Sequence, residues 1–367
     1  MTLSVVPFTP EHEPAAAAFN ERMRTAKAPS AFLLPIRGRA LARHGQVSVA
    51  QYLAIDTAGD VRGGMLCHEY PGVIAGRPQR IMNISAPLSE GIVDGAYTFV
   101  GPLLIKYAVK QNPHAFVVGM GSGSNPLPRL LKAMGWHLLE VPFYFKLLRA
   151  AHAVRELGPL RSSAARRVAA GVAAVTGVAA VAVAALQRPS SPARRVAGRY
   201  DVLPVEQWTS SADGVWSAFA SSISVGVERT THVLPFFYPR EAAGPRAWAL
   251  CRDRRVVGWF GLLITHMKNN AYFGNLTVAT LTDVVGDRDA ILAATVLAPA
   301  QARSAGADII ITNQQHHAVR DSCIAAGWRP GPSNFLFATS KALSADVDWD
   351  RAYVTRRDGD GLVNLGG

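Results

Sequence analysis

Residues His114–Leu147, HAFVVGMGSGSNPLPRLLKAMGWHLLEVPFYFKL, have a counterpart at Gly306–Thr339, GADIIITNQQHHAVRDSCIAAGWRPGPSNFLFAT. Each stretch starts with a five-residue strand pattern, continues through a polar or glycine-rich turn, and then shows a helical pattern that ends at Gly-Trp. The stretches align without a gap, and an aromatic residue lies ten positions beyond each glycine, at Phe145 and Phe337. This repetition predicts that the chain folds as two related units.

The same order of elements precedes both copies. Before the first copy, the sequence predicts a helix, three strands and a second helix, over 13–26, 52–56, 62–68, 80–85 and 102–111. Before the second copy, it predicts strands and a long helix, over 248–252, 256–265, 272–280 and 289–305. The matched order predicts an α/β fold with mixed sheets, built from two tandem units that are related by internal duplication.

Length and composition agree with two domains. The predicted units span 1–150 and 200–345, with a linker at 151–199 and a tail at 346–367. Hydrophobic residues make up 49% of the 367 positions, which is enough for two packed cores. Three widely spaced cysteines form no disulfide pattern, and the N-terminal residues lack a secretory-signal pattern. We therefore expect a reducing, cytoplasmic environment.

The net charge of +12 is concentrated around the linker. Between Arg149 and Arg199 there are nine arginines and one acid, Glu156, so the two units are close to neutral. Nucleic-acid binding is not expected, because such proteins more often spread basic residues over a folded face. Within the linker, Val168–Leu186 is an apolar run without a charge. It predicts a helix packed between the domains or a helix on an anionic membrane surface through 161–199. A membrane span is disfavoured because arginines lie on both sides.

The repeated stretches share an ordered motif of a strand, a turn with an asparagine, a helix and a Gly-Trp end. The motif residues are Asn125 with Gly135-Trp136, and Asn313 with Gly327-Trp328. This motif resembles the GNAT acyltransferase fold, over about 1–148 and 200–345. The tandem arrangement is similar to the FemAB-like aminoacyl transferases and to the GNAT-like proteins of bacterial exopolysaccharide clusters. The tail, with Asp348-Trp349 and 356–361, is similar to the endings of the exopolysaccharide type.

The resemblance implies a coenzyme A thioester, such as acetyl-CoA or another acyl-CoA, as the donor substrate. It implies that the thioester lies between two splayed parallel strands, with its pyrophosphate on the N–H groups of the next helix. The cofactor-binding candidates of the first copy are Gly91, Gly95, Gly101, Ser122, Ser124 and Asn125. The loop of the second copy has a single glycine, Gly286, among Asp283, Asp287 and Asp289. Three carboxylates facing a pyrophosphate would repel it, so we expect coenzyme A at the first copy.

Catalytic and substrate-binding candidates lie near these loops. Glu90 is either a general base or a solvated loop acid, and His68, next to Glu69, is either a base with its orienting acid or part of a surface turn. The predicted substrate-binding residues are Asn313, His316 and His317. Neighbouring residues on a helix do not share a face, so we predict no metal site at the two histidines. The polar cluster that ends at Asn125 either binds an anion or caps a helix.

The resemblance thus implies an acyl-CoA-dependent N- or O-acyltransferase that acts on a sugar or another cell-envelope precursor by direct attack on the thioester. The alternative is a non-catalytic tandem-GNAT adaptor at a membrane surface or in a polysaccharide machine. The family's general-acid tyrosine falls at Leu131 and Cys323, which favours the alternative. Aminoacyl transfer from tRNA is a third hypothesis, disfavoured by the nearly neutral units. The expected location is the cytoplasm, with peripheral association at the inner face of the membrane left open.

Overall fold

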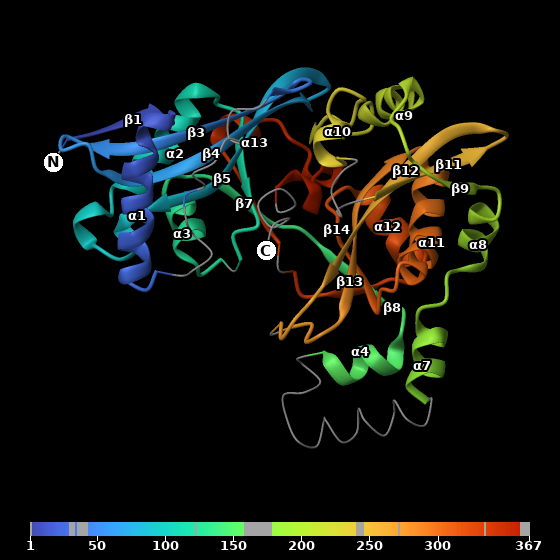
Figure 1. Ribbon diagram of the computed structural model, residues 1–367. Coiled ribbons are helices and arrows are strands. Elements are labelled where there is room, and N and C mark those ends of the chain that lie inside the picture. The colour runs from blue at the N-terminus through green and yellow to red at the C-terminus, as the bar shows by residue number, and fades with distance from the viewer. Residues whose placement is uncertain are drawn as a thin grey trace. The chain divides into compact units, whose positions relative to one another are not determined.

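A computed structural model describes residues 2–28, 34, 43–121, 123–157, 178–239, 246–270, 272–333 and 335–359. The chain forms two compact units that are interleaved in sequence, and Figure 1 labels most of their helices and many of their strands. Unit 1 consists of Met1–Leu139 with Leu336–Val347, and unit 2 of Glu140–Phe335 with Asp348–Gly367. The units therefore differ from the continuous ranges that the repeat predicts.

Unit 1 is built on a mixed sheet with the strand order β1-β3-β4-β5-β6-β16-β7. Its strands are β1 (Leu3–Pro7), β2 (Arg43–His44), β3 (Val47–Asp56), β4 (Val61–Ile74), β5 (Arg77–Ser89), β6 (Ala115–Val118), β7 (His137–Glu140) and β16 (Leu336–Thr339). Its helices are α1 (Glu13–Thr25), α2 (Val100–Gln111), α3 (Pro126–Ala133) and α13 (Lys341–Ser344), with 3-10 turns η1 (Pro10–His12), η3 (Glu90–Ile92) and η4 (Gly95–Tyr97). Strands β5 and β6 run parallel, since α2 carries the chain back between them.

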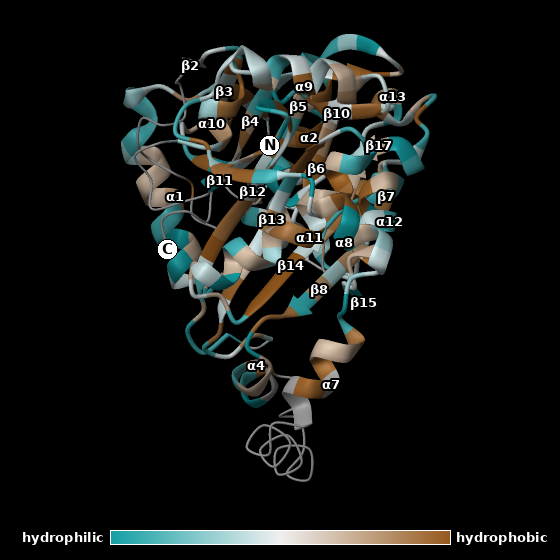
Figure 2. Cartoon of the chain, turned by 90° about the vertical axis from the view of Figure 1, so that its right-hand side faces the viewer, coloured by the Kyte–Doolittle hydropathy of each residue, from teal (hydrophilic) through white to brown (hydrophobic). Residues whose placement is uncertain are grey.

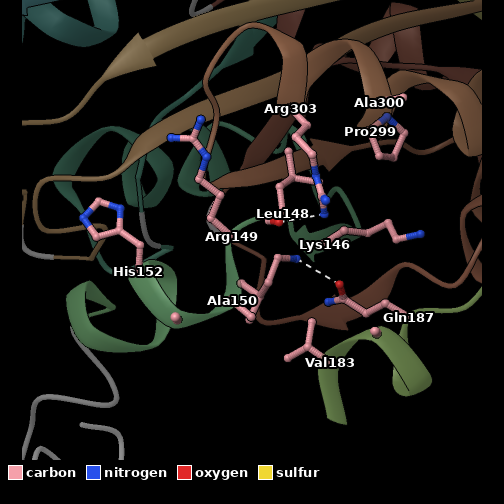
Figure 3. Close-up of a pocket in the computed structure, with 13 residues that line it drawn as sticks. Lys146, Leu148, Arg149, Ala150, His152, Val183, Gln187, Pro299, Ala300 and Arg303 are labelled. Atoms are coloured by element: carbon pink, nitrogen blue, oxygen red, sulfur yellow. Dashed lines mark hydrogen bonds between the residues drawn. The ribbon is translucent and has the colours of Figure 1, made fainter. Parts of the chain in front are cut away.

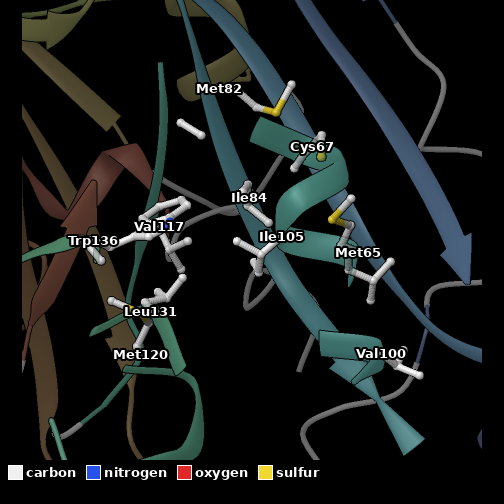
Figure 4. Close-up of a cluster of buried hydrophobic side chains, with 14 of the residues drawn as sticks. Met65, Cys67, Met82, Ile84, Val100, Ile105, Val117, Met120, Leu131 and Trp136 are labelled. Carbon is white, nitrogen blue, oxygen red and sulfur yellow. The ribbon is translucent and has the colours of Figure 1, made fainter. Parts of the chain in front are cut away.

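Helices cover both faces of this sheet. Successive side chains of a strand point to opposite faces, and on β3 Leu53 packs in the cluster with α1 whereas Ala54 packs in the cluster with α2. Figure 4 shows the larger cluster, which includes Val100 and Ile105 of α2 and Met65 of β4. Each large apolar side chain buried there stabilises the fold by about 1.5–3 kcal/mol. This core fixes the start of α2 against the sheet.

Unit 2 has a second mixed sheet with the order β15-β8-β14-β13-β12-β11-β9. The strands of unit 2 are β8 (Phe143–Leu147), β9 (Asp201–Pro204), β10 (Val225–Val227), β11 (Arg246–Arg252), β12 (Arg255–His266), β13 (Thr277–Gly286), β14 (Ile309–Asn313), β15 (Arg329–Gly331) and β17 (Ala352–Tyr353). Of these, β10 and β17 lie outside the sheet order just given. Its helices are α4 (Ala150–Glu156), α7 (Val178–Leu186), α8 (Ser191–Ala197), α9 (Ser210–Ala220), α10 (Leu234–Phe237), α11 (Arg288–Ser304) and α12 (His317–Ala325), with 3-10 turns η5 (Trp349–Arg351) and η6 (Arg356–Asp358).

The two sheets have the same strand order, which confirms the predicted duplication of an α/β fold. Each of the seven strands in the order of unit 1 has an equivalent in the order of unit 2, with the parallel pair β13 and β14 matching β5 and β6. The closing strands are exchanged between the repeats. Phe145 lies in β8 beside β14, and Phe337 lies in β16 beside β6. The sequence repeat predicts these two strands and does not indicate the exchange.

Most of the predicted elements are present. The predicted helices at 13–26, 102–111 and 289–305 correspond to α1, α2 and α11. After α3 and α12 the chain turns at Gly135 and Gly327, whose φ angles of +77° and +80° favour glycine because it has no side chain. The strand predicted at 272–280 was misplaced, because Asn270 and Gly274 form a turn there and β13 begins only at Thr277.

The linker forms short helices in unit 2, although residues 158–177 and most of the predicted apolar run lie outside the described residues. The segment after α7 packs on unit 2, because Ser190 donates its N–H to the Ala325 carbonyl at 2.9 Å. Helix α7 itself exposes apolar side chains and is coloured as hydrophobic in Figure 2, with Val181 72% and Leu186 60% exposed. Among the helices of the described residues, none has the length and apolar character that a membrane crossing requires.

Candidate functional site

The parallel strands of unit 1 part after a short stretch of pairing. Strands β5 and β6 pair at Met82 with Ala115 and at Asn83 with Phe116. Beyond this point β5 continues to Ser89, while the other edge of β6 pairs with β16. The register between β4 and β5 also shifts here, next to a residue with positive φ, Ala86. A bulge of this kind bends the strand away from its neighbour, so the sheet opens at the middle of unit 1.

His68 lies on β4 beside this opening. His68 pairs with Asn83 on the neighbouring strand β5, and the Nδ1 atom of His68 is 3.4 Å from the Ser85 hydroxyl. Cys67 belongs to the core under α2, so strand alternation places His68 on the opposite face. Burial lowers the pKa of His68 to about 4, because the charged imidazolium loses hydration there. The ring is therefore neutral near pH 7 and has the protonation state of a general base.

The loop from Ser89 to α2 leads to a helix end that its own N-cap residue does not satisfy. The N-cap residue is Phe99, whose ring has no hydrogen-bond acceptor. Gly91 lets the loop fold on itself, since a Cβ there would lie 2.6 Å from the Tyr97 carbonyl. Gly101 faces Leu130 of α3, and Gly95 faces open space. Backbone N–H groups at such an end attract phosphate groups.

In unit 2 the equivalent strands part after three paired positions. The pairs are Val278 with Ile309, Ala279 with Ile310, and Thr280 with Ile311. A register shift between Gly261 and Leu262 marks a bulge in the same place as in unit 1. Here, however, the helix that follows the opening is capped by a side chain, because Asp287 accepts a hydrogen bond from the Ala290 N–H at 2.7 Å. A carboxylate at this position opposes a second anion.

The C-terminal segment Ala352–Asp358 contacts both strands of unit 2 beyond the point where they part. On the side of β13, the Tyr353 hydroxyl accepts the N–H of Val284 at 3.2 Å. On the side of β14, Gln314 forms an isolated bridge with Thr355. These contacts use backbone groups that splayed strands would otherwise present to a ligand. The opening of unit 2 is thus filled by the protein's own chain.

Comparisons with known proteins agree with this architecture at the level of the fold. No protein-family model and no curated protein matches the sequence. The structure is similar to a GCN5-related N-acetyltransferase (GNAT) from Anabaena variabilis, with a TM-score of 0.54 and 8% identity over 92% of this chain and 72% of that chain. The chain has the GNAT fold. It is also similar to the N-myristoyltransferase of Saccharomyces cerevisiae solved with myristoyl-CoA and inhibitors, with a TM-score of 0.51 and 10% identity over 96% and 84%.

Glu90 has a structural role in this GNAT fold. The residue is 5% exposed, and both carboxylate oxygens are bound by arginines. Arg22 donates to Oε1 at 2.8 Å, and Arg62 donates to Oε2 at 3.2 Å. Both oxygens are therefore engaged within unit 1 and do not face an acceptor substrate. Glu90 is therefore not included as a general base in the proposed site. Because it is buried, it is also not a solvated loop acid.

The polar turn after β6 differs from the expected helix cap. Asn125 is the N-cap residue of α3, but its side-chain Nδ2 donates to the Met120 carbonyl at 3.0 Å and makes no cap. The amide closes the turn on itself, and Gly121, with φ of +73°, lies against it. Ser124 is exposed at the same turn, and Ser122 lies outside the described residues. The turn therefore remains a candidate for anion binding only through its backbone and Ser124.

A buried ionic network in unit 2 explains Asp283. Its carboxylate is fully buried and lies 3.1 Å from Arg229, which also binds Asp358 at 2.7 Å. The Tyr238 hydroxyl donates to Asp283 at 2.7 Å. The neighbouring carboxylates raise the pKa of Arg229 well above its ordinary value despite its burial, so it stays charged. Asp283 was expected to be one of three acids that repel a pyrophosphate from this loop, but its carboxylate is paired inside the unit and does not face the loop.

The substrate-binding candidates of the second copy separate into two groups. Asn313 is fully buried, donates to the Val141 carbonyl at 3.1 Å and accepts from Arg356 Nε at 2.6 Å. It holds the tail in place, so it does not face a substrate. His317 is exposed, with Nδ1 3.0 Å from the Asp350 carbonyl. His316 is buried, and both histidines line a cavity of about 610 Å³.

A wider groove of about 800 Å³ lies elsewhere in unit 2, between α4, α7 and α11. The Gln187 side chain accepts the Leu147 N–H at 3.1 Å, and Arg303 donates to the Leu148 carbonyl at 2.7 Å, both drawn in Figure 3. The basic side chains of this groove point in different directions, with Arg149 on one side and Lys146 on the other (Figure 3). Lys146 donates to the Ala326 carbonyl at 2.8 Å, which shows a structural use.

Proposed function

We propose that the protein is an acyl-CoA-dependent N- or O-acyltransferase that acts on a sugar or another cell-envelope precursor, with the donor bound by unit 1. The observation that carries the assignment to unit 1 is the contrast between the two helix ends. The N-cap residue of α2 is Phe99, which has no acceptor, whereas α11 is capped by the carboxylate of Asp287. The N-cap position of α2 therefore carries no carboxylate that would oppose a pyrophosphate at this helix end, whereas that of α11 does.

The donor site proposed for unit 1 has two parts. The first turn of α2 and the loop with Gly95 and Gly101 would hold the pyrophosphate. The opening between β5 and β6 would hold the thioester arm. Phe99 is 41% exposed beside the helix end and offers an apolar face to the arm. In unit 2 the equivalent opening is filled by Ala352–Asp358, so the same two-part site is not offered there.

The reaction proposed for this site needs one proton acceptor. The acceptor amine or hydroxyl attacks the thioester carbonyl, the new C–N or C–O bond forms, and the C–S bond breaks. The proton of the nucleophile goes to the neutral ring of His68 and then to the leaving thiolate, so that the base is regenerated. Its low pKa keeps His68 unprotonated near pH 7, and its place beside the opening of β5 supports this role.

The acceptor class rests on the resemblance of the tail to GNAT-like proteins of exopolysaccharide clusters. In the structure, the tail residue Arg356 binds Asn313, and Asp358 binds Arg229. These tail residues therefore also hold unit 2 together. The resemblance of the tail is for this reason weaker support for the proposed acceptor class than the helix ends are for the donor site. The donor assignment does not depend on it.

Coenzyme A binding by calorimetry tests the donor site. Gly95→Asp adds a carboxylate to the loop without a steric clash, because a Cβ at Gly95 has nothing within 4 Å. We expect coenzyme A to bind about fivefold or more weakly, because the new carboxylate repels the pyrophosphate. Two like charges about 4 Å apart repel each other by about 1 kcal/mol even in water. Gly214→Asp in α9 of unit 2 is the matched control, as Gly214 also faces open space. Equal affinity of both variants and the wild type would exclude the proposed donor site.

A second candidate function is a non-catalytic adaptor at an anionic membrane surface. The exposed apolar side chains of α7 favour it, together with the arginines that flank the linker run in sequence. Co-sedimentation with anionic and neutral vesicles tests it, using the wild type and Val181→Asp with Leu186→Asp. The adaptor reading predicts binding to anionic vesicles that the double variant loses, with no acyl transfer in either protein. Turnover of an acyl-CoA by the wild type would contradict it.

A further inference from the structure

One side chain of unit 1 contacts both turns of the loop that leads to α2. We call the loop from Ser89 to Phe99 the donor loop, and it contains the 3-10 turns η3 and η4. Arg62, on β4, donates from Nη1 to Oε2 of Glu90 in η3 at 3.2 Å. The same guanidinium lies over the ring of Tyr97 in η4, with its Cζ atom 4.6 Å from the ring centre. Arg62 therefore links the start of the donor loop to its end.

The other two guanidinium nitrogens of Arg62 bind the hairpin between β3 and β4. Nε donates to Asp56 at the end of β3, and Nη2 donates to Asp60 in the hairpin turn, both at 2.8 Å. The three nitrogen atoms thus bind three carboxylates, from β3, the hairpin turn and η3. A lysine could not reproduce this arrangement, because its ammonium group lacks the planar fork of donors. The Arg62 side chain is only 13% exposed, so water competes weakly for these contacts.

The two turns of the donor loop depend on Arg62 to different degrees. In η3, Glu90 is also bound by Arg22 of α1, which donates to its two oxygens at 2.8 and 3.1 Å. Without Arg62, Arg22 would still hold η3 in place. The turn η4 would instead lose the charged group that connects Tyr97 with η3 and with the hairpin. We therefore expect the loss of Arg62 to loosen η4 relative to η3.

A loop that already has its binding shape loses less conformational freedom when a ligand arrives, and this increases affinity. We propose that Arg62 is a positioning residue, which holds η3 and η4 in one arrangement before coenzyme A binds. This role rests on the donor site proposed for unit 1. Arg62 acts through Glu90 and Tyr97 and not by contact with the donor. It also offsets the negative charge of Glu90, which would otherwise oppose a pyrophosphate at the loop.

Amide hydrogen exchange of the full-length chain, followed by NMR without any ligand, tests the positioning role. The amides of Val93 and Tyr97 form hydrogen bonds at the ends of η3 and η4, at 2.9 and 3.1 Å. In Arg62→Met we expect both amides to exchange about tenfold faster or more, because hydrogen bonds to a charged group have been removed. Arg24→Met is the matched control, since it removes an exposed ion pair of α1, and it should leave both rates unchanged.

Calorimetry with coenzyme A measures the consequence for the donor, at urea-free conditions where each variant is folded. We expect Arg62→Met to bind coenzyme A about tenfold more weakly. Tyr97→Leu removes the ring below the guanidinium, and it should weaken binding about two- to fivefold. Ile81→Ala controls for lost stability, because it removes a buried side chain nearer the other end of β5. It should destabilise unit 1 and keep the coenzyme A affinity within about twofold.

Unchanged amide exchange in folded Arg62→Met would overturn the positioning role, and so would equal effects of Arg62→Met and Ile81→Ala on the loop amides or on coenzyme A affinity. If Arg62→Met does not fold, Tyr97→Leu provides the same test, with about two- to fivefold faster exchange expected. A wild type that does not bind coenzyme A would refute the donor site proposed for unit 1. The exchange of the unliganded loop would still decide the role of Arg62, so the two proposals fail separately.

Discussion

Replacing Arg229 tests the account of the filled opening in unit 2. Its guanidinium is fully buried, binds Asp283 and Asp358, and lies 4.4 Å over the Phe237 ring. Arg229→Met keeps the length of the side chain and leaves two buried carboxylates without their shared cation. Breaking a buried ion pair in this way costs about 3–5 kcal/mol. The same substitution at the exposed Arg255 is expected to cost less than about 0.5 kcal/mol.

Urea unfolding followed by tryptophan fluorescence measures this loss. Burial raises the pKa of Asp358 already in the wild type, and removal of Arg229 raises it further. A carboxyl whose pKa is higher in the folded state than in the unfolded state destabilises the fold when the pH lies above the folded-state pKa. This destabilisation disappears when the pH falls below the unfolded-state pKa. The deficit of Arg229→Met should therefore shrink as the pH falls towards about 4, the pKa of an unfolded aspartate.

A triple variant separates charge from packing. Adding Asp283→Asn and Asp358→Asn to Arg229→Met removes the uncompensated charge, so we expect recovery of at least about half of the lost stability. A loss below about 1 kcal/mol for Arg229→Met, or a loss that does not change with pH, would refute the reasoning that this network holds the tail in unit 2.

Three further predictions concern single residues. His68→Ala should abolish acyl transfer and leave coenzyme A affinity within about twofold. In the wild type, kcat/KM should fall only as the pH drops towards the pKa of about 4, and a step near the ordinary histidine value of about 6.5 would contradict the role. Glu90→Gln should lower the free energy of unfolding by about 1–3 kcal/mol, with turnover per folded molecule retained, whereas a general base would lose turnover. Gly327→Ala should cost about 1–3 kcal/mol in urea unfolding, because its φ is +80° and the Gln187 carbonyl lies against it, and Gly123→Ala is the unhindered control.

The order of elements was predictable because its signals are local. Strand patterns, a helix that ends at glycine, and the spacing between them recur in each repeat, and both sheets show the same strand order. The exchange of the closing strands was not predictable. Phe145 and Phe337 hold the same position in the sequence repeat, and each lies in a strand that pairs with the other repeat. The sequence pattern alone contains no preference between the two sheets.

The candidate site was predictable only in part. Chain position gave the loop before α2 and the opening beside His68. The role of Glu90 depends on Arg22 and Arg62, which are distant in sequence, and that of Asp283 depends on Arg229 in the same way. Such partners meet only in the folded chain. The tail residues were noted as a family resemblance, and nothing in their sequence indicated that they fill the second opening.

Hydrogen–deuterium exchange with and without coenzyme A tests the central claim, that the donor binds unit 1 and not unit 2. The account predicts slower exchange in the loop from Ser89 to Gly101 and in the first turn of α2, with no change at Gly286–Asp289. Protection at Gly286–Asp289 and the start of α11, with none in the loop of unit 1, would contradict it.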